Sequence, residues 1–298
     1  MKPPTAILAA TDLSAPSRHA AERACQLAAQ MGASLNLLHV LQQGALAQMQ
    51  QLIGPAAEVY AQQIAAEAAR ALDGLAADCV RKHDIVVESE VIEGAVVNSI
   101  CTQAAALAAD LLVVGARGEG FLRHMLLGST ASRLLRKTLL PVLVVKQSPH
   151  EAYRRLLVTV DFSPLSALVL AQARAIAPQA QLVLLHAFEV PFEGKLMFAG
   201  VEEAEIYRYR ISAKQEAMRK LHEFAAVAGL AADAATLLVQ HGDATQQIIR
   251  QEQEQDCDLI VLGKHGDLLE DYLLGSVTKH VLAESQGDVL VVSAGEAA

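Results

Sequence analysis

The chain has 298 residues, of which 53% are hydrophobic and 19% are charged, and this composition excludes a largely disordered protein. Its length predicts roughly two domains, each large enough to bury a core. The net charge of −9 falls entirely on residues 151–298, because residues 1–150 contain 12 basic and 12 acidic residues. An acidic balance without a basic patch argues against nucleic acid as a partner.

The apolar stretches are short and interrupted by charge, so none approaches the roughly 20 residues that a membrane helix needs, and we expect no contact with a membrane. The first residues lack the apolar run and the cleavage site of a signal peptide. No spacing of cysteines or histidines is typical of a metal site built by the protein alone. We therefore predict a cytoplasmic protein, whose cysteines are small buried thiols in a reducing compartment: Cys25, Cys79, Cys101 and Cys257.

In the first half, short apolar runs alternate with amphipathic stretches. Ser14 and Pro16 introduce a helix that Gly32 ends. The runs that predict strands are 7–12, 35–40, 85–91, 111–115 and 142–145, and further helices are predicted at about 56–82, 98–109 and 129–137. Strands and helices that alternate at this spacing indicate a parallel sheet with right-handed crossovers.

The second half repeats the first. Residues 156–163 resemble 7–14, residues 259–278 repeat the pattern of 111–130, and 289–292 repeat 142–145. We predict two copies of one α/β domain, 1–147 and 151–298, packed as a pseudo-twofold pair. Because the last strand of each copy is an apolar run at a sheet edge, we expect 142–145 to pair with 289–292.

One stretch predicts a site for phosphate. Gly115 ends the fourth strand, Gly118 follows after two residues, and Gly128-Ser129-Thr130 opens a helix after nine more. Glycines let backbone amides approach an anion, and the helix N-terminus and hydroxyls add donors. Open parallel sheets bind ligands at the carboxyl ends of their strands, which is where this motif lies. Three arginines bring positive charge nearby: Arg117, Arg123 and Arg133.

With Ala9-Ala-Thr-Asp12-Leu-Ser14 and Leu37-Leu-His39-Val40, this glycine spacing resembles the universal stress protein family in its tandem form, over essentially the whole chain. The resemblance implies two doubly wound α/β domains, each a five-stranded parallel sheet of order 3-2-1-4-5 with helices on both faces. It also implies ATP across the carboxyl ends of strands one and four, with Mg²⁺ or Mn²⁺ shared by its oxygens.

By this resemblance, Asp12 and the backbone of Val40 meet the adenine, and Val114 and Gly115 meet the ribose and first phosphate. The residues implied for nucleotide binding are Ala10, Thr11, Asp12, Val40, Val114, Gly115, Arg117, Gly118, Gly128, Ser129 and Thr130. An acid at the end of strand one can accept a hydrogen bond from an adenine amine, which agrees with this assignment.

The second half differs in its loop. Eight residues separate Gly266 from Gly275, and Asp267, Glu270 and Asp271 among them are acidic, whereas the first loop has Arg117 and Arg123 against Glu119 alone. A carboxylate close to a phosphate costs roughly 1–4 kcal/mol. We therefore expect ATP in the first half. Binding in the second half stays open, because Gly263, Lys264, Ser276 and Thr278 keep donors and a glycine cradle.

Other residues have structural interpretations. We expect Asp161 to cap the helix that follows it, His39 and His186 to be hydrogen-bonded core residues, and His265 to be polar surface. The apolar passage 188–200 is expected to lie over the other half or over its own sheet, with a docking surface as the alternative.

No base that could position water is evident near the first loop, so the leading prediction is an ATP-binding stress-response regulatory protein and not an enzyme. The alternatives are a slow ATPase or self-phosphorylating protein, with Ser129 or Thr130 as acceptors, and a nucleotide-free scaffold. An intramolecular pseudo-dimer is expected, and a further homodimer or an unidentified protein partner is compatible with the sequence.

Overall fold

A computed structural model describes residues 2–44, 51, 54, 56–118, 127–264 and 274–294. The first half contains β1 (Ala6–Ala10), α1 (Ala15–Met31), β2 (Ser34–Gln42), α3 (Ala56–His83), β3 (Val87–Gly94), α4 (Val96–Ala106), β4 (Leu111–Gly115), α5 (Ser129–Lys137) and β5 (Val142–Val145). The second half contains β6 (Arg155–Thr159), α6 (Pro164–Ile176), β7 (Gln181–Phe188), α7 (Glu193–Phe198), α8 (Glu203–Val227), β8 (Ala235–His241), α9 (Ala244–Glu254), β9 (Leu259–Lys264), α10 (Ser276–Glu284) and β10 (Asp288–Ser293).

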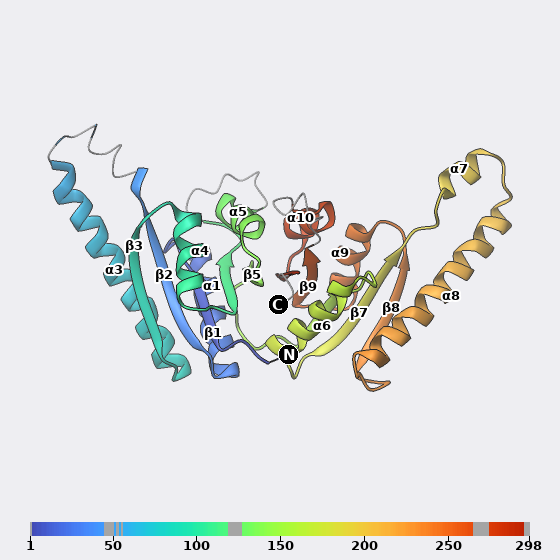
Figure 1. Ribbon diagram of the computed structural model, residues 1–298, viewed down its shortest axis with the longest axis horizontal. Helices are drawn as coiled ribbons and strands as arrows, with labels where there is room; N and C mark the ends of the chain where they lie inside the picture. Colours follow the sequence, from blue (N-terminus) through green and yellow to red (C-terminus); the bar gives the residue numbers. More distant parts are fainter. Residues whose placement is uncertain are drawn as a thin grey trace.

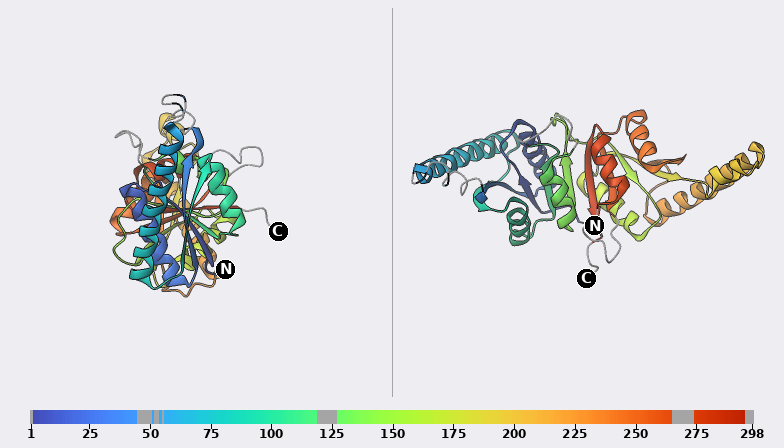
Figure 2. Two further views of the ribbon diagram at one scale, coloured as in Figure 1. Left: turned by 90° about the vertical axis from the view of Figure 1, so that its left-hand side faces the viewer. Right: turned by 90° about the horizontal axis from the view of Figure 1, so that it is seen from above.

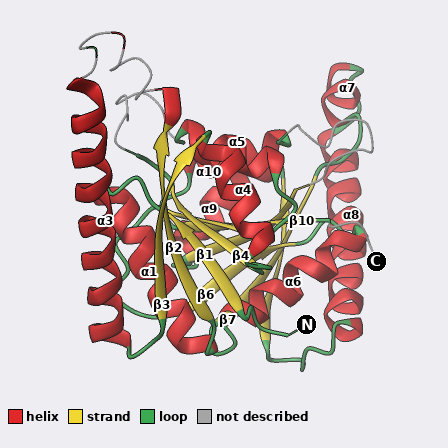
Figure 3. Cartoon of the chain, turned by 60° about the vertical axis from the view of Figure 1, so that its left-hand side comes forward, coloured by secondary structure: helices red, strands yellow, loops and turns green. Residues whose placement is uncertain are grey.

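The strands form one continuous sheet of order β3-β2-β1-β4-β5-β10-β9-β6-β7-β8. Each half therefore has the order 3-2-1-4-5, and neighbouring strands within each half are parallel (Figure 3). This confirms the expected pair of doubly wound α/β units.

The two halves meet through their last strands. β5 and β10 pair antiparallel, with Val142 opposite Val291 and Val144 opposite Val289. This is the intramolecular pairing expected from the two apolar edge runs, and each strand covers the other's backbone edge. The halves consequently extend to opposite sides of the centre, with α3 at one end and α8 at the other (Figures 1 and 2).

Helices cover both faces of the sheet. Buried side chains of α1, α3, α6 and α8 pack in one core, and those of α4, α5, α9 and α10 pack in the other. The strands between them are apolar on both faces, which is why β4, β5 and β10 are buried along almost their whole length. No helix within the described ranges is long and apolar enough to cross a membrane.

The predicted elements are confirmed closely where local signals are strong. β4, α5 and β5 have the expected bounds, and α1 ends as expected at Gly32, whose φ of 66° lies in the left-handed region that favours glycine. The expected helix at 98–109 begins earlier, at Val96, because it follows the strand directly without a side-chain cap.

Two of the four cysteines are not the free thiols that we expected. Cys25 of α1 and Cys79 of α3 form a disulfide, and both are fully buried. Cys101 and Cys257 are free. Sequence spacing gave no sign of this pair because the two residues are 54 positions apart and meet only when α3 packs on α1. Since structural disulfides are rare in reducing compartments, the cysteines no longer support the cytoplasmic location, which stays a prediction.

The expectation that the apolar passage 188–200 lies over its own sheet or the other half holds only for its start, where Phe188 is buried and Val190 packs against the core, and is wrong for α7. β7 ends at Phe188, and α7 stands at the outer end of the second half, beside the start of α8 (Figure 1). Phe192, Met197 and Phe198 are exposed, and α7 buries no residue. Glu193 holds α7 to its surroundings, because its carboxylate accepts a hydrogen bond from Arg210 of α8 and pairs with His241 of β8 at 2.8 Å.

Candidate functional site

A cavity of about 430 Å³ lies at the carboxyl ends of β1, β2 and β4, and is called the first cleft below. The sheet register aligns Ala10, the last residue of β1, with Leu38 of β2 on one side and Val114 of β4 on the other, and these three residues line the cleft. Every residue expected to bind nucleotide lines this cleft: Ala10, Thr11, Asp12, Val40, Val114, Gly115, Arg117, Gly118, Gly128, Ser129 and Thr130. Their role as ligands stays a prediction.

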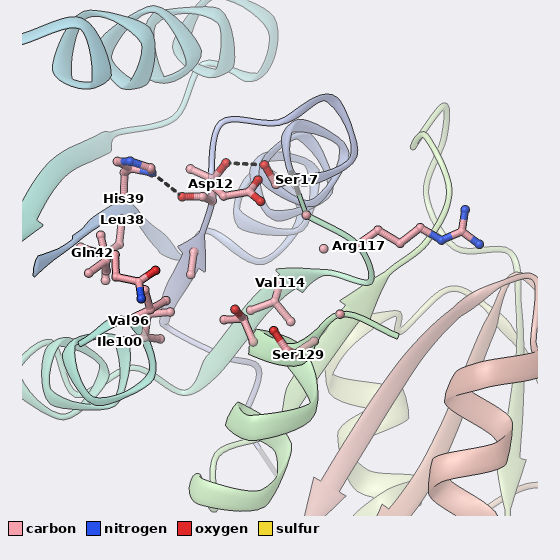
Figure 4. A pocket seen from close by; sticks show the side chains of 18 of the residues that line it. Asp12, Ser17, Leu38, His39, Gln42, Val96, Ile100, Val114, Arg117 and Ser129 are labelled. Atoms are coloured by element: carbon pink, nitrogen blue, oxygen red, sulfur yellow. Dashed lines mark hydrogen bonds between the residues drawn. The ribbon is translucent and has the colours of Figure 1, made fainter. Parts of the chain in front are cut away.

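The N-terminus of α5 forms one wall of the first cleft. Gly128 is its N-cap residue, no side chain caps the helix, and its first turn contains no acid. The first main-chain bond of the helix runs from the amide of Ser132 to the carbonyl of Gly128 at 3.0 Å, so the preceding amides have no partner within the helix. Ser129 and Thr130 add hydroxyls, and Ser129 lies beside the hollow (Figure 4). This wall can bind an anion.

At each of the three glycines an added side chain would force a neighbour to move. A Cβ on Gly115 would lie 3.2 Å from Cα of Ser17, and one on Gly128 would lie 3.2 Å from the carbonyl oxygen of Ala116. A Cβ on Gly118 would collide with Oδ2 of Asp12. The glycine spacing therefore reflects close approach of the loop to α1 and to the Asp12 carboxylate, which leaves the backbone accessible from the cleft.

A strained turn positions Asp12. Leu13 has a φ of 65°, which is unfavourable for leucine, and its amide donates to Oγ1 of Thr11 at 3.0 Å. Oδ1 of Asp12 accepts hydrogen bonds from the amide and the hydroxyl of Ser14, at 3.1 and 2.6 Å. The carboxylate is thereby held at the mouth of the cleft, facing Gly118.

The far end of the first cleft was only partly predicted. Gln42 at the end of β2, and Val96 and Ile100 on α4, line it together with Val40 (Figure 4). Val96 and Ile100 are four residues apart, a spacing that places them on one helix face, but only the fold directs that face to the cleft. The other lining residues that sequence reasoning missed are Ser17, Leu38, His39, Leu41 and Ala131.

His39 supports the lining of the first cleft. Its Nδ1 lies 2.8 Å from the carbonyl oxygen of Thr11, so Nδ1 carries the proton and donates. His186 makes the same contact with Val160 in the second half at 2.7 Å. Both confirm the expectation of hydrogen-bonded histidines.

The expected positive charge is arranged differently. The Arg117 side chain points away from the other labelled side chains of the cleft (Figure 4), although the residue lines it. Arg133 is exposed and is not a lining residue. Donors around the cleft are thus mainly backbone amides and hydroxyls. The following residues lie outside the described ranges: Glu119, Arg123, His265, Gly266, Asp267, Glu270 and Asp271.

A smaller cavity of about 250 Å³ has the corresponding position in the second half. Asp161 lines it, but its Oδ1 accepts hydrogen bonds from the Ser163 amide, the Ser163 hydroxyl and the Ser166 hydroxyl, at 2.9, 2.6 and 2.6 Å. Asp161 was expected to cap α6. The cap position belongs to Ser163, and Asp161 instead organises the first turn from two residues further back.

The first cleft can accommodate a phosphorylated ligand, because it combines a glycine cradle, an uncapped helix N-terminus and hydroxyls. Within the described ranges, no group of three or more His, Cys, Asp or Glu side chains could hold a metal ion.

The fold and the site define a tandem doubly wound α/β protein with a ligand cleft at the carboxyl ends of parallel strands. The model of the universal stress protein family matches residues 5–146 and 152–293. The chain belongs to the universal stress protein family, as a tandem form with two such units.

Relatives agree with this assignment. A universal stress protein of Mycolicibacterium smegmatis is 28% identical over 230 residues, which cover 72% of each chain. A universal stress protein of Mycobacterium tuberculosis is 31% identical over 195 residues, or 61% of each chain. Among solved structures, a universal stress protein from Archaeoglobus fulgidus has a TM-score of 0.68 at 20% identity, covering 98% of this chain and 99% of that one, so the fold is shared over the full length.

Proposed function

We propose that this chain is an ATP-binding regulatory protein of the stress response, which holds the nucleotide in the first cleft. The observation that carries the proposal is that residues from β1, β2, β4 and α5, selected from sequence, all line one cavity. Membership of the universal stress protein family supports it.

The proposed pose follows the chemistry of the walls. The triphosphate lies along Gly115, Gly118 and the N-terminus of α5, where amides and the hydroxyls of Ser129 and Thr130 donate to its oxygens. The base lies between β2 and α4, against Val40, Val96 and Ile100, near the Asp12 carboxylate. Mg²⁺ or Mn²⁺ bound with the nucleotide would neutralise part of the phosphate charge beside Ser129 and Thr130.

The test compares Gly118→Ala with wild type by isothermal titration with MgATP. Because the added Cβ collides with Oδ2 of Asp12, the loop or the carboxylate must move, and we expect binding to weaken by about tenfold or more. Gly194→Ala is the matched control, because a Cβ there meets nothing within 4 Å. Equal affinity of all three proteins would contradict the proposed pose, and absence of ATP binding by wild type would contradict the function.

A further inference from the structure

α7 presents apolar side chains at the outer end of the second half, away from the centre of the molecule (Figure 1). Phe192, Met197 and Phe198 are exposed, Phe198 to 96%, and α7 buries no residue. On the neighbouring helix α8, Tyr207 and Ile211 are also exposed, and their spacing of four residues places them on one face of that helix. These five side chains are called the α7 patch below.

Polar contacts hold α7 in this position. The Glu193 carboxylate accepts a hydrogen bond from Nε of Arg210 at 2.7 Å, and Nε2 of His241 lies 2.8 Å from it. Arg210 lies between Tyr207 and Ile211 in α8, so the same contact brings α7 beside these two side chains. The apolar side chains of the patch therefore keep a defined arrangement, and a partner that binds them need not order them first.

The charge around the α7 patch is acidic. Residues 189–205 contain five acids and one base. Glu193 and Glu205 are paired with arginines of α8, and the base, Lys195, lies over the ring of Phe192 at 5.3 Å from its centroid. Three exposed acids form no ion pair with any residue that the structure describes: Glu189, Glu202 and Glu203. The charge left for a partner at this surface is therefore negative.

This charge discriminates among the surfaces that can cover exposed apolar side chains. A second copy of the chain can present its own α7 patch, which would place acids against acids. It can also present Val59, Tyr60 and Ile64, the exposed apolar side chains of α3, but residues 45–66 contain no Lys or Arg. An anionic membrane surface has the same sign as the acids. The complementary surface is apolar and basic.

We propose that the α7 patch is a docking surface for a basic amphipathic segment of another protein. The apolar face of that segment covers the exposed aromatic and methionine side chains, and its Lys or Arg side chains pair with the three unpaired acids. Aromatic residues and methionine are enriched at protein interfaces, and an exposed apolar patch with a polar rim marks such a site. The inference goes beyond nucleotide binding and does not depend on the first cleft.

The test uses the full chain and a fluorescent amphipathic helix of about 18 residues, made of Leu and Lys, in fluorescence anisotropy at about 0.15 M salt. A helix in which Glu replaces every Lys is the charge control, and should not bind. Phe192→Ser/Phe198→Ser keeps the acids and should weaken binding of the Leu/Lys helix by about tenfold or more. Glu202→Gln/Glu203→Gln should weaken it and reduce its dependence on salt. Val227→Ser is the matched control and should bind as wild type does, because Val227 is 90% exposed at the opposite end of α8.

Three outcomes would overturn the proposal. The first is no binding of the Leu/Lys helix by wild type, or equal binding by wild type and Phe192→Ser/Phe198→Ser with like melting curves, because attraction to the net negative charge would then suffice. The second is binding of the Leu/Glu helix as tight as that of the Leu/Lys helix, which would contradict the basic chemistry of the partner. The third is sedimentation of wild type as a dimer that the same double variant does not form, which would assign the patch to a second copy. All three leave the proposed nucleotide site standing.

Discussion

At the scale of single residues, Lys146 is unusual because it is a lysine held at the junction of the two halves. It follows β5, and its Nζ donates to the carbonyl and hydroxyl oxygens of Ser285 at 2.7 and 2.6 Å. Burial lowers the pKa of Lys146 to about 8, Glu252 and Asp288 oppose this shift, and the charge of Arg117 adds to it.

This pKa predicts a pH dependence of stability. Between about pH 8 and the ordinary lysine value of 10.5, the unfolded chain binds more protons at this residue than the folded chain does. Its contribution to the free energy of unfolding therefore increases as pH rises through that window, and is lost as pH falls through 8. In urea unfolding, the free energy of unfolding of wild type should increase relative to that of Lys146→Met between about pH 7 and about pH 10. A pH-independent difference would contradict this, and Lys82→Met is the surface control.

At the scale of elements, α3 is anchored by only part of its length. Leu72, Ala76 and Cys79 are buried, whereas Tyr60 and Ile64 nearer its start are exposed and only Ala57 is buried among the described side chains of the first two turns. The disulfide to α1 lies in the buried part. It therefore reinforces the end of α3 that packs on the core and leaves the other end to weaker contacts.

Loss of this disulfide should destabilise the first half. For a separation of 54 residues, the loss of chain entropy in the unfolded state corresponds to about 4 kcal/mol, and measured values are commonly about 2–4 kcal/mol. We expect the free energy of unfolding of Cys25→Ala/Cys79→Ala to fall by about 2–4 kcal/mol. A dithiol reductant should produce a similar loss in wild type and none in the double variant. Titration of four thiols in unreduced, denatured wild type would contradict the pairing.

At the scale of the whole molecule, a buried polar cluster joins the halves beside the β5–β10 pair. Asp288 at the start of β10 is 1% exposed and accepts a hydrogen bond from the Tyr153 hydroxyl at 2.6 Å and from the Lys146 amide at 2.8 Å. It also pairs with Arg23 of α1 at 3.4 Å, and the guanidinium of Arg23 stacks over the Tyr153 ring. One carboxylate of the second half thus contacts Arg23 and Lys146 of the first half as well as Tyr153 of its own half.

Removal of this carboxylate should be costly, because Arg23 would keep a buried charge without its counterion. We expect Asp288→Ala to lower the free energy of unfolding by about 3–5 kcal/mol. Tyr153→Phe removes only one hydrogen bond to the same carboxylate and should cost about 1–2 kcal/mol. Urea unfolding of the three proteins measures both effects. An Asp288→Ala variant no less stable than Tyr153→Phe would show that the cluster does not hold the halves together.

The sequence by itself determined the features that depend on local patterns. The two-unit organisation and the β5–β10 pairing followed from apolar runs and their repetition, because a strand buried on both faces must be apolar throughout. The strand order followed from the family resemblance. The part of the first cleft formed by β1, β4 and the start of α5 followed from the glycine motif and the family resemblance, because glycine lets the backbone approach its neighbours closely, as Gly118 approaches the Asp12 carboxylate.

Only the tertiary structure decided the direction of side chains and the contacts between residues that are far apart in the chain. The outward course of Arg117, the Cys25–Cys79 bond and the position of α7 each result from the packing of segments far apart in the chain. The same holds for the side chain of Leu165, which lies against Gly263, 98 residues later. Periodicity fixes which residues are buried, but the partner of a buried side chain is chosen by the three-dimensional arrangement of the elements.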